Sequence, residues 1–373
     1  MAQTLLAFDT PPADLQTGFD IGWDHARHGV LPPPQHWGDD HPVHQGFSAG
    51  KACFTGRTLA ASPRVRRWLA LRAHAWQRGL AFELAQVTPH YLGQIDVARC
   101  PVTRQPLGAG EASVDRVCDA AGYAAGNLAL LSIQANRAKG SLGWKDALVC
   151  AQRAESVEPG GSGRIDGLDA AAWMRVAVLI SFVTPLTHEQ AARIPLRVLP
   201  PNRLRLLNPV QGLQALVTRE LARPDGTRRL RAISELLPGD GLRADFARFL
   251  SALLPRCLQA GRDADMQALR DALEDAWADG LVVRSGQRFA LQLDEALVER
   301  LLERCAAAGL AGMHLLLHAR ATATEGWALD TRGRATPSAA ARRTRSRLPA
   351  GVPVDRARIG PSRPRFADGH LPA

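Results

Sequence analysis

The polar residues that could carry out chemistry are concentrated within residues 113–140. This run contains two acids, Asp115 and Asp119, and two asparagines, Asn127 and Asn136. Carboxylate and amide oxygens are the ligands that Mg²⁺ prefers, and one bound divalent cation can hold a phosphodiester and stabilise its leaving oxygen. Taken singly, the same residues have ordinary explanations as members of surface ion pairs, turns or exposed helix positions.

Two further segments precede this run in an ordered series. Residues 78–84 read RGLAFEL and residues 100–104 read CPVTR, and they are followed by SVDRVCDAAGYAAGN from Ser113 and ANRAK from Ala135. In this order the four segments resemble the HNH (His-Me finger, ββα-metal) endonucleases. They resemble more closely a phage-associated subgroup that has Asp-Arg in place of the usual Asp-His. The resemblance covers residues 62–155 and implies nothing about the rest of the chain.

The resemblance implies a ββα core and a role for each matched position. Asp115 and Asn136 are expected to hold one Mg²⁺ or Mn²⁺ ion between the first strand and the helix. Asn127 is expected to bridge the backbone of the intervening loop, which is a structural role. Arg137 and Lys139 on the helix are expected to position a nucleic-acid phosphate by charge.

The resemblance leaves the base open, because Arg116 stands where the family has its catalytic histidine. A neutral imidazole accepts a proton from water near pH 7, whereas an arginine stays protonated and has no acceptor. Three alternatives remain. The module keeps only DNA binding and Arg116 clamps a phosphate. Another group, such as His90, Asp119 or an N-terminal histidine, is the base. Or water reacts without a side-chain base while Arg116 stabilises charge in the transition state.

Four predicted elements position these residues. Ser62 followed by proline is typical of a helix start, and Gly79 is a natural end for that helix. A strand is predicted over residues 111–117, a second extended run over 127–132, and a helix over 133–139. The predicted fold class is therefore α+β, with a small ββα HNH-like module.

Positive charge gathers at two places. Arg72 and Arg78 lie on the predicted helix that begins after Ser62, as part of either a solvated face or a phosphate-contacting face beside the active site. Residues 331–373 contain ten arginines against two acids and supply most of the formal net charge of +10. Such a tail favours binding to nucleic acid through counterion release. Because the module resembles DNA endonucleases, DNA is the expected partner. The alternative is a disordered terminus that only aids solubility.

Composition divides the chain into four parts. Residues 1–60 are rich in proline and histidine and are predicted to be irregular. The HNH-like module occupies residues 61–155. After a Gly/Ser-rich linker, residues 165–325 are predicted to be mainly helical, with one hairpin over residues 281–293. Residues 331–373 are predicted to be a disordered basic tail.

Several classes of protein are excluded by composition. The six cysteines are scattered without a C-x-x-C pair, which argues against a disulfide framework and a zinc ribbon. The apolar stretch at residues 176–186 is too short to cross a bilayer. The N-terminal residues do not follow the pattern of a signal peptide. We therefore expect a cytoplasmic protein without a membrane partner.

Three functions follow as predictions. The leading one is a DNA endonuclease that uses Mg²⁺ to hydrolyse phosphodiesters, or a derivative of such an enzyme. The second is a non-catalytic nucleic-acid-binding protein that retains the HNH fold. The third is a scaffold that binds a protein partner through its helical region, in which the HNH-like part is only structural.

Overall fold

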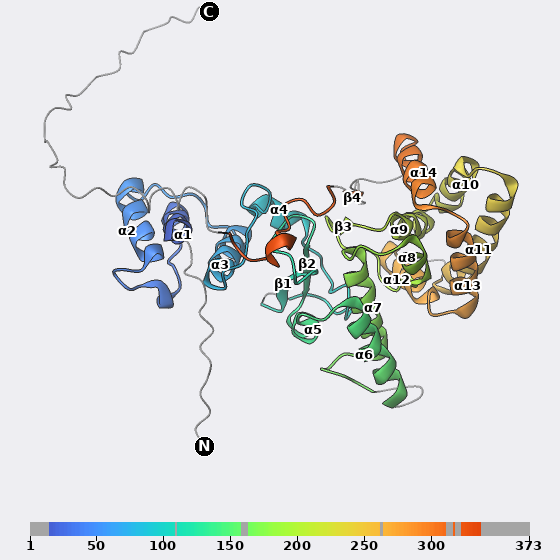
Figure 1. Ribbon diagram of the computed structural model, residues 1–373, viewed down its shortest axis with the longest axis horizontal. Helices are drawn as coiled ribbons and strands as arrows, with labels where there is room; N and C mark the ends of the chain where they lie inside the picture. The colour runs from blue at the N-terminus through green and yellow to red at the C-terminus, as the bar shows by residue number, and fades with distance from the viewer. Residues whose placement is uncertain are drawn as a thin grey trace, which may run out of the picture. The chain divides into compact units, whose positions relative to one another are not determined.

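A computed structural model describes the chain at residues 15–108, 110–157, 163–261, 264–310, 316–317 and 322–336. In these ranges a small antiparallel sheet is followed by many helices, which agrees with an α+β class at a coarse level (Figure 1). The predicted tail beyond Thr336 lies outside the described residues. No helix in the described ranges is both long enough and apolar enough to cross a bilayer.

The elements have the following bounds. The helices are α1 Leu15–Arg27, α2 Pro42–Phe54, α3 Pro63–Gln77, α4 Pro89–Gln94, α5 Ile133–Lys139, α6 Trp144–Val157, α7 Ala170–Phe182, α8 His188–Arg193, α9 Pro209–Leu221, α10 Gly226–Leu236, α11 Asp240–Gln259, α12 Met266–Ala276, α13 Gly280–Leu291 and α14 Glu295–Ala307. The strands are β1 Ala112–Arg116, β2 Leu128–Ser132, β3 Arg205–Leu206 and β4 Leu316–Leu317. Two short 3₁₀ turns are η1 Pro34–His36 and η2 Leu329–Thr331.

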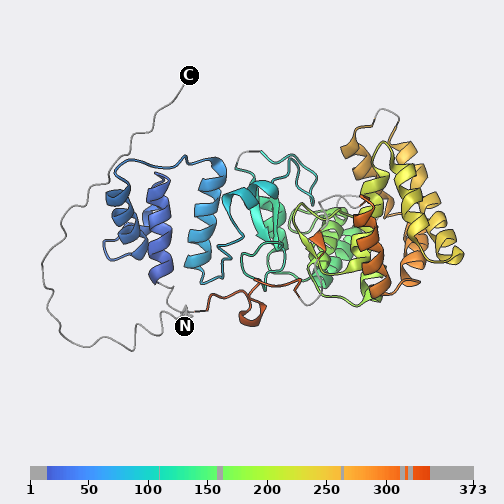
Figure 2. The same ribbon diagram turned by 90° about the horizontal axis from the view of Figure 1, so that it is seen from above.

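The N-terminal region is helical, so the irregular segment predicted for residues 1–60 is wrong over most of the part described. Helices α1 and α2 pack against each other, and α1 also contacts α3 (Figure 2). Proline, read in the sequence as a breaker, instead begins α2: Pro42 occupies the first turn, where no backbone hydrogen bond is lost. The ring of His41 caps this helix by accepting a hydrogen bond from the Val43 amide.

Glycines allow α1 and α2 to approach each other closely. A Cβ atom on Gly22 would overlap the carbonyl oxygen of Val43, and one on Gly46 would overlap the carbonyl oxygen of Phe19. Ile21 and Val43 are buried at this contact. These glycines therefore serve a helix–helix interface and do not mark loops.

The ββα unit forms as predicted from the sequence. Strands β1 and β2 are antiparallel, and Asp115 lies opposite Ala129 in the ladder. Helix α5 follows β2 without a loop, because the Ser132 hydroxyl caps it by accepting a hydrogen bond from the Ala135 amide. It ends at Gly140, whose φ of +49° is accessible to glycine at low cost.

The core of the ββα unit continues into the helical region. Ala129 and Leu131 of β2 belong to the same buried cluster as Trp173 and Phe182 of α7. Helix α6 packs along α7 across the predicted linker. The Gly/Ser-rich segment therefore does not separate two hydrophobic cores.

The hairpin predicted over residues 281–293 is wrong, because α13 occupies most of that range. The Asp279 carboxylate caps the helix by accepting hydrogen bonds from the amides of Leu281 and Val282. Gly286, in the middle of the predicted hairpin, lies where a Cβ atom would come within 2.9 Å of the Phe249 ring. It is a close-packing position inside a helix.

The chain returns to the ββα unit at residues 322–336, which we call the return segment. The fully buried Trp327 accepts a hydrogen bond at its carbonyl from the Gly122 amide, at 2.8 Å. The Gly333 carbonyl accepts one from the Ala81 amide, also at 2.8 Å. In Figure 1 this red-orange segment lies beside the strands β1 and β2.

The return segment corrects one boundary of the predicted disordered tail. Residues 331–336 are ordered, because their backbone is hydrogen-bonded to the module: the Ala335 amide donates to the Gly79 carbonyl at 3.0 Å. The Arg334 guanidinium donates to the Arg78 carbonyl at 2.9 Å.

Candidate functional site

The candidate site is a polar seam between β1 and α5, made of Ser113, Asp115, Asn136 and Lys139. Alternate residues of a strand face the same side, which places Ser113 and Asp115 together. Residues three apart on a helix are neighbours, which places Asn136 and Lys139 together. Two contacts join the pairs across the seam: Lys139 to Asp115, and Asn136 to Ser113.

The Lys139 ammonium occupies the charged end of this β1–α5 seam. Its Nζ lies 3.2 Å from one Asp115 carboxylate oxygen and 3.1 Å from the other. It also donates to the Arg116 carbonyl at 2.9 Å. Lys139 is fully buried and Asp115 is 5% exposed. The ammonium is thus held between a carboxylate and a backbone carbonyl, away from solvent.

Burial and the ion pair act in opposite directions on Asp115. Burial raises the pKa of the Asp115 carboxyl above its usual value, and the Lys139 ammonium opposes that rise. A buried carboxylate requires a compensating positive charge close by, and Lys139 supplies it. Among the residues the structure describes, no group of three or more His, Cys, Asp or Glu side chains could hold a metal ion.

Asn136 lies one turn along α5 from Lys139. Its amide nitrogen donates to the Ser113 hydroxyl at 2.8 Å, and the residue is half-buried. Asn136 is therefore coupled to Ser113, while the Asp115 carboxylate is taken by Lys139. As arranged, these side chains do not fit a two-ligand cation site, because an ammonium faces the carboxylate.

Arg116 binds the loop that follows β1. Its guanidinium donates to the carbonyls of Asp119 and Ala121, each at 3.0 Å. It also pairs with the Asp119 carboxylate at 2.6 Å and lies over the Tyr123 ring, 5.4 Å from the ring centroid. These contacts engage both terminal nitrogens. Arg116 and Asp119 therefore hold the loop together. The Asp119 carboxylate, a candidate general base, is paired with the Arg116 guanidinium.

Asn127, the residue just before β2, binds the same loop. Its side-chain oxygen accepts from the Cys118 amide at 2.8 Å. Its amide nitrogen donates to the carbonyls of Cys118 and Gly122, at 3.1 and 3.2 Å. The side chain is fully buried, so its polar atoms have the loop backbone as their partners.

His90 lies on α4, exposed at the surface. Its Nε2 atom is 2.9 Å from the side-chain nitrogen of Gln94, one turn further along the helix. No hydrogen bond or ion pair among the described residues joins it to Asp115 or Asp119. The structure thus does not bring His90 to the seam as a base.

The three arginines predicted to contact nucleic acid differ in exposure. Arg137 and Arg78 are exposed, on α5 and just after α3. Arg72 is 4% exposed, pairs with Asp24 of α1, and lies over the Trp68 ring at 4.5 Å. The guanidinium of Arg72 joins α3 to α1 and is not available to a phosphate.

Two features of the site were missed in the sequence. Ser113 was not expected as the partner of Asn136, although its spacing of two residues from Asp115 places both on one strand face. The return segment was also missed: the Trp327 indole donates to the Ala125 carbonyl at 3.2 Å. A lone buried tryptophan far along the chain gives no local sign of its partner.

Comparison with protein-family models, with curated proteins and with solved structures gave no match. The fold and site together define a mixed α and β protein. Its ββα unit carries a buried lysine–carboxylate pair and is tied to the C-terminal part of the chain.

Proposed function

We propose that the chain binds DNA through its HNH-like ββα unit and has no metal-dependent hydrolysis of its own. The observation that carries this proposal is the buried Lys139 ammonium on the Asp115 carboxylate, 3.1 Å away. The ammonium provides a fixed positive charge where the HNH resemblance calls for a divalent cation. Displacing it would leave a buried, unpaired lysine, which is costly.

The chemistry of Arg116 supports the same proposal. Arg116 stands at the family's histidine position, and an arginine cannot accept a proton from water. Its guanidinium is also engaged by the loop at Asp119 and Ala121. In this arrangement Arg116 holds the loop and does not activate water.

DNA contact is assigned to exposed positive charge. Arg137 is exposed on α5, where the sequence analysis expects a phosphate contact, and Arg78 is exposed at the end of α3. Residues 331–373 add ten arginines and two acids. Arginine side chains bind phosphates by charge and by paired hydrogen bonds, which position a protein without reading sequence.

The test combines binding with cleavage. Fluorescence anisotropy with a labelled duplex is expected to show salt-sensitive binding in EDTA that changes little when Mg²⁺ is added. A supercoiled plasmid with Mg²⁺ or Mn²⁺ across about pH 6–9 is expected to stay intact. Metal-dependent nicking that disappears in Asp115→Ala would overturn the proposal.

A charge substitution tests where the duplex docks. Arg137→Gln is expected to weaken binding severalfold, because it removes one phosphate contact beside the seam. Arg231→Gln is the matched control, since Arg231 is an exposed helical arginine of α10, 84% exposed. Equal effects of the two substitutions would show that the ββα unit has no special part in binding.

The second candidate is the Mg²⁺-dependent endonuclease itself. It is favoured by one observation: among the described residues, the Asp115 Oδ2 atom accepts no well-aligned hydrogen bond, although the ammonium is near. A cation could use that oxygen only if Lys139 moved. Nicking of DNA that needs Mg²⁺ and Asp115, but survives deletion of residues 337–373, would decide for this candidate.

A further inference from the structure

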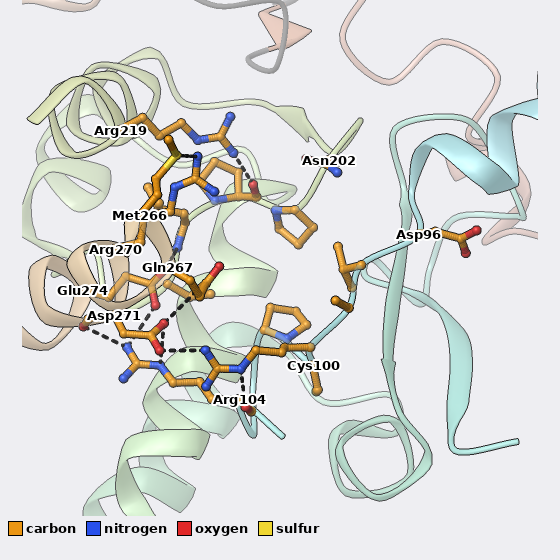
Figure 3. A pocket seen from close by; sticks show the side chains of 18 of the residues that line it. Asp96, Cys100, Arg104, Asn202, Arg219, Met266, Gln267, Arg270, Asp271 and Glu274 are labelled. Atoms are coloured by element: carbon orange, nitrogen blue, oxygen red, sulfur yellow. Dashed lines mark hydrogen bonds and ion pairs between the residues drawn. The ribbon is translucent and has the colours of Figure 1, made fainter. Parts of the chain in front are cut away.

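A cleft lies apart from the β1–α5 seam, between residues 96–104 and the helices α9 and α12 (Figure 3). Its volume is about 690 Å³. This falls within the range of about 300–1,000 Å³ that is usual for small-molecule sites. Its walls combine arginines with apolar and proline residues, among them Val198, Pro201 and Met266.

Two acids in the cleft are neutralised by arginines from the ββα side. Asp271 pairs with Arg99 at 2.8 Å, and Glu274 pairs with Arg104 at 2.9 Å. Glu274 also accepts a hydrogen bond from the Leu199 amide at 2.9 Å. Neither carboxylate is left to balance a further cation.

The two remaining acids of the lining are also paired. Glu220 is ion-paired with Arg229 of α10. Asp96 is ion-paired with Arg67 of α3, at 2.5 Å. Every carboxylate lining the cleft therefore already has an arginine partner.

Two arginines of the lining remain without a carboxylate. Arg219 donates to the Pro200 carbonyl at 2.6 Å, and Arg270 contacts the Met266 sulfur at 3.2 Å. No ion pair to either guanidinium occurs in the part of the chain that the structure describes. The Arg270 Nε atom is buried and has no hydrogen-bond partner there. Figure 3 shows both side chains at the same end of the cleft, reached from α9 and α12.

The Arg270 guanidinium repels the half-buried Arg219 guanidinium, and the individually smaller attractions of Glu274 and Glu220 oppose that effect. Burial, and then the charge of Arg270, lower the pKa of Arg219 to about 10. An anion placed between them would relieve this repulsion and supply the hydrogen-bond acceptors that are missing.

We propose that this cleft binds a phosphate group between Arg219 and Arg270, with the organic part of the ligand against the apolar wall. The planar guanidinium fork matches the oxygens of a phosphate in pairs. A phosphomonoester carries nearly two negative charges near neutral pH, which matches two arginines better than a carboxylate does. The site shares no residue with the β1–α5 seam, so it stands independently of the DNA-binding proposal.

The experiment is isothermal titration calorimetry of the full chain with inorganic phosphate, adenosine 5′-monophosphate and adenosine. The two phosphate-bearing probes are expected to bind and adenosine is not. Arg270→Gln is the main variant, because Arg270 makes no backbone hydrogen bond that folding would miss. It is expected to weaken binding by about tenfold or more. Arg231→Gln, outside the cleft, is expected to leave binding unchanged.

Further arms identify the source of the phosphate. An oligonucleotide that competes with adenosine 5′-monophosphate would assign the cleft to backbone phosphates, and a lack of competition would assign it to a small phosphorylated ligand. Arg219→Gln is expected to reproduce the loss seen with Arg270→Gln, with folding checked by circular dichroism. Absence of binding by every phosphate-bearing probe, or binding unaffected by both substitutions, would overturn the proposal.

Discussion

The position of the Lys139 ammonium group distinguishes a structural ion pair from a metal site at Asp115. The ammonium lies at Asp115 because both side chains are on the inner faces of their elements, where they are buried. A divalent cation in the same place would bring two charges and could exchange, whereas an ammonium brings one charge and is covalently tied to the fold. The pair therefore gives the seam a structural role.

Substitution of Lys139 tests that role. Lys139→Met is expected to lower the free energy of unfolding by about 3–5 kcal/mol, because it leaves the Asp115 carboxylate buried without a counter-charge. The measurement is urea unfolding followed by circular dichroism. Lys145→Met on α6 is the control: Lys145 is exposed and only lies over the Trp144 ring, so its loss is expected to cost about 1 kcal/mol or less. A Lys139→Met variant as stable as the parent would contradict the assigned role.

At the scale of the element, the sequence predicted best where the signals are local. Helix α5 begins after Ser132 and ends before Gly140, and both residues act through contacts within a few positions. The bounds predicted for α5, residues 133–139, are those observed. The same holds for the start of α3 at Ser62, whose hydroxyl accepts from the Val65 amide.

The predicted secondary structure was wrong where contacts with residues distant in the sequence determine whether a segment is a helix or a strand. Val282 and Val283 favour a strand by their branching, yet Val282 and Phe289 pack one face of a helix into the core. Gly286 is required by the Phe249 ring, which lies far away in the sequence. The site shows the same limit: no spacing could tell that Lys139 faces a buried carboxylate instead of a phosphate in solvent.

Three histidines with buried or half-buried rings make the N-terminal part of the fold sensitive to acid: His25 of α1, His36 of η1, and His41, which caps α2. The His36 and His41 rings lie 3.2 Å apart between Nδ1 and Nε2, and His36 also contacts Gln77 of α3. Burial lowers the pKa of His25, His36 and His41 below the ordinary value of 6.5. Neutral rings are therefore part of the folded arrangement.

The pH dependence follows from this difference between the two states. The unfolded chain takes up these protons near pH 6.5 and the folded chain only at lower pH. Below pH 6.5 the unfolded state binds more protons, so stability is expected to fall, by at most about 1.4 kcal/mol per pH unit for each histidine. Urea unfolding at about pH 7.5 and about pH 5 measures the slope.

Two substitutions distinguish the effect of a buried histidine on the pH dependence of stability from that of an exposed histidine. His36→Gln is expected to reduce the pH slope, because one titrating buried ring is removed. His90→Gln, at an exposed position of α4, is expected to leave the slope as in the parent chain. An unchanged slope in His36→Gln would show that the acid sensitivity arises elsewhere.

At the scale of the whole described chain, the return segment links distant parts of the sequence. Trp327 is fully buried, and Arg205 donates to the carbonyls of Ala323 and Glu325, at 3.2 and 2.8 Å. Gly126, on the loop before β2, accepts a hydrogen bond at its carbonyl from the Arg205 amide at 2.9 Å. The loop, β3 and the return segment therefore form one connected arrangement.

Removal of the tryptophan tests this connection. Trp327→Ala is expected to lower the free energy of unfolding by about 3–5 kcal/mol, the usual cost of deleting a buried large ring. Leu329→Ala, two residues along the same segment and 39% exposed, is expected to cost about 0.5 kcal/mol or less. Hydrogen exchange of the amides at Ala81 and Gly122 reports the same event, because both donate to the return segment. Equal stability of the two variants would contradict a role for the segment in the fold.

Positive charge is divided between the described residues and residues 337–373. Residues 337–373 contain eight arginines and two acids, while Arg137 and Arg78 belong to the described part. Each phosphate contact contributes about 0.9 to the slope of log affinity against log salt. A chain ending at Thr336 is expected to bind duplex DNA more weakly, with a slope reduced by at most about 7.

The residual binding of this shortened chain is the decisive quantity. If the ββα unit docks on DNA, the chain ending at Thr336 still binds at low salt, and Arg137→Gln weakens that binding while Arg231→Gln does not. Anisotropy titrations at several salt concentrations measure both the affinity and the slope. Complete loss of binding in the shortened chain would place all affinity in the tail and remove the ββα unit from DNA recognition. Because the phosphate cleft at Arg219 and Arg270 lies within the shortened chain, its calorimetric signal is expected to persist under either outcome.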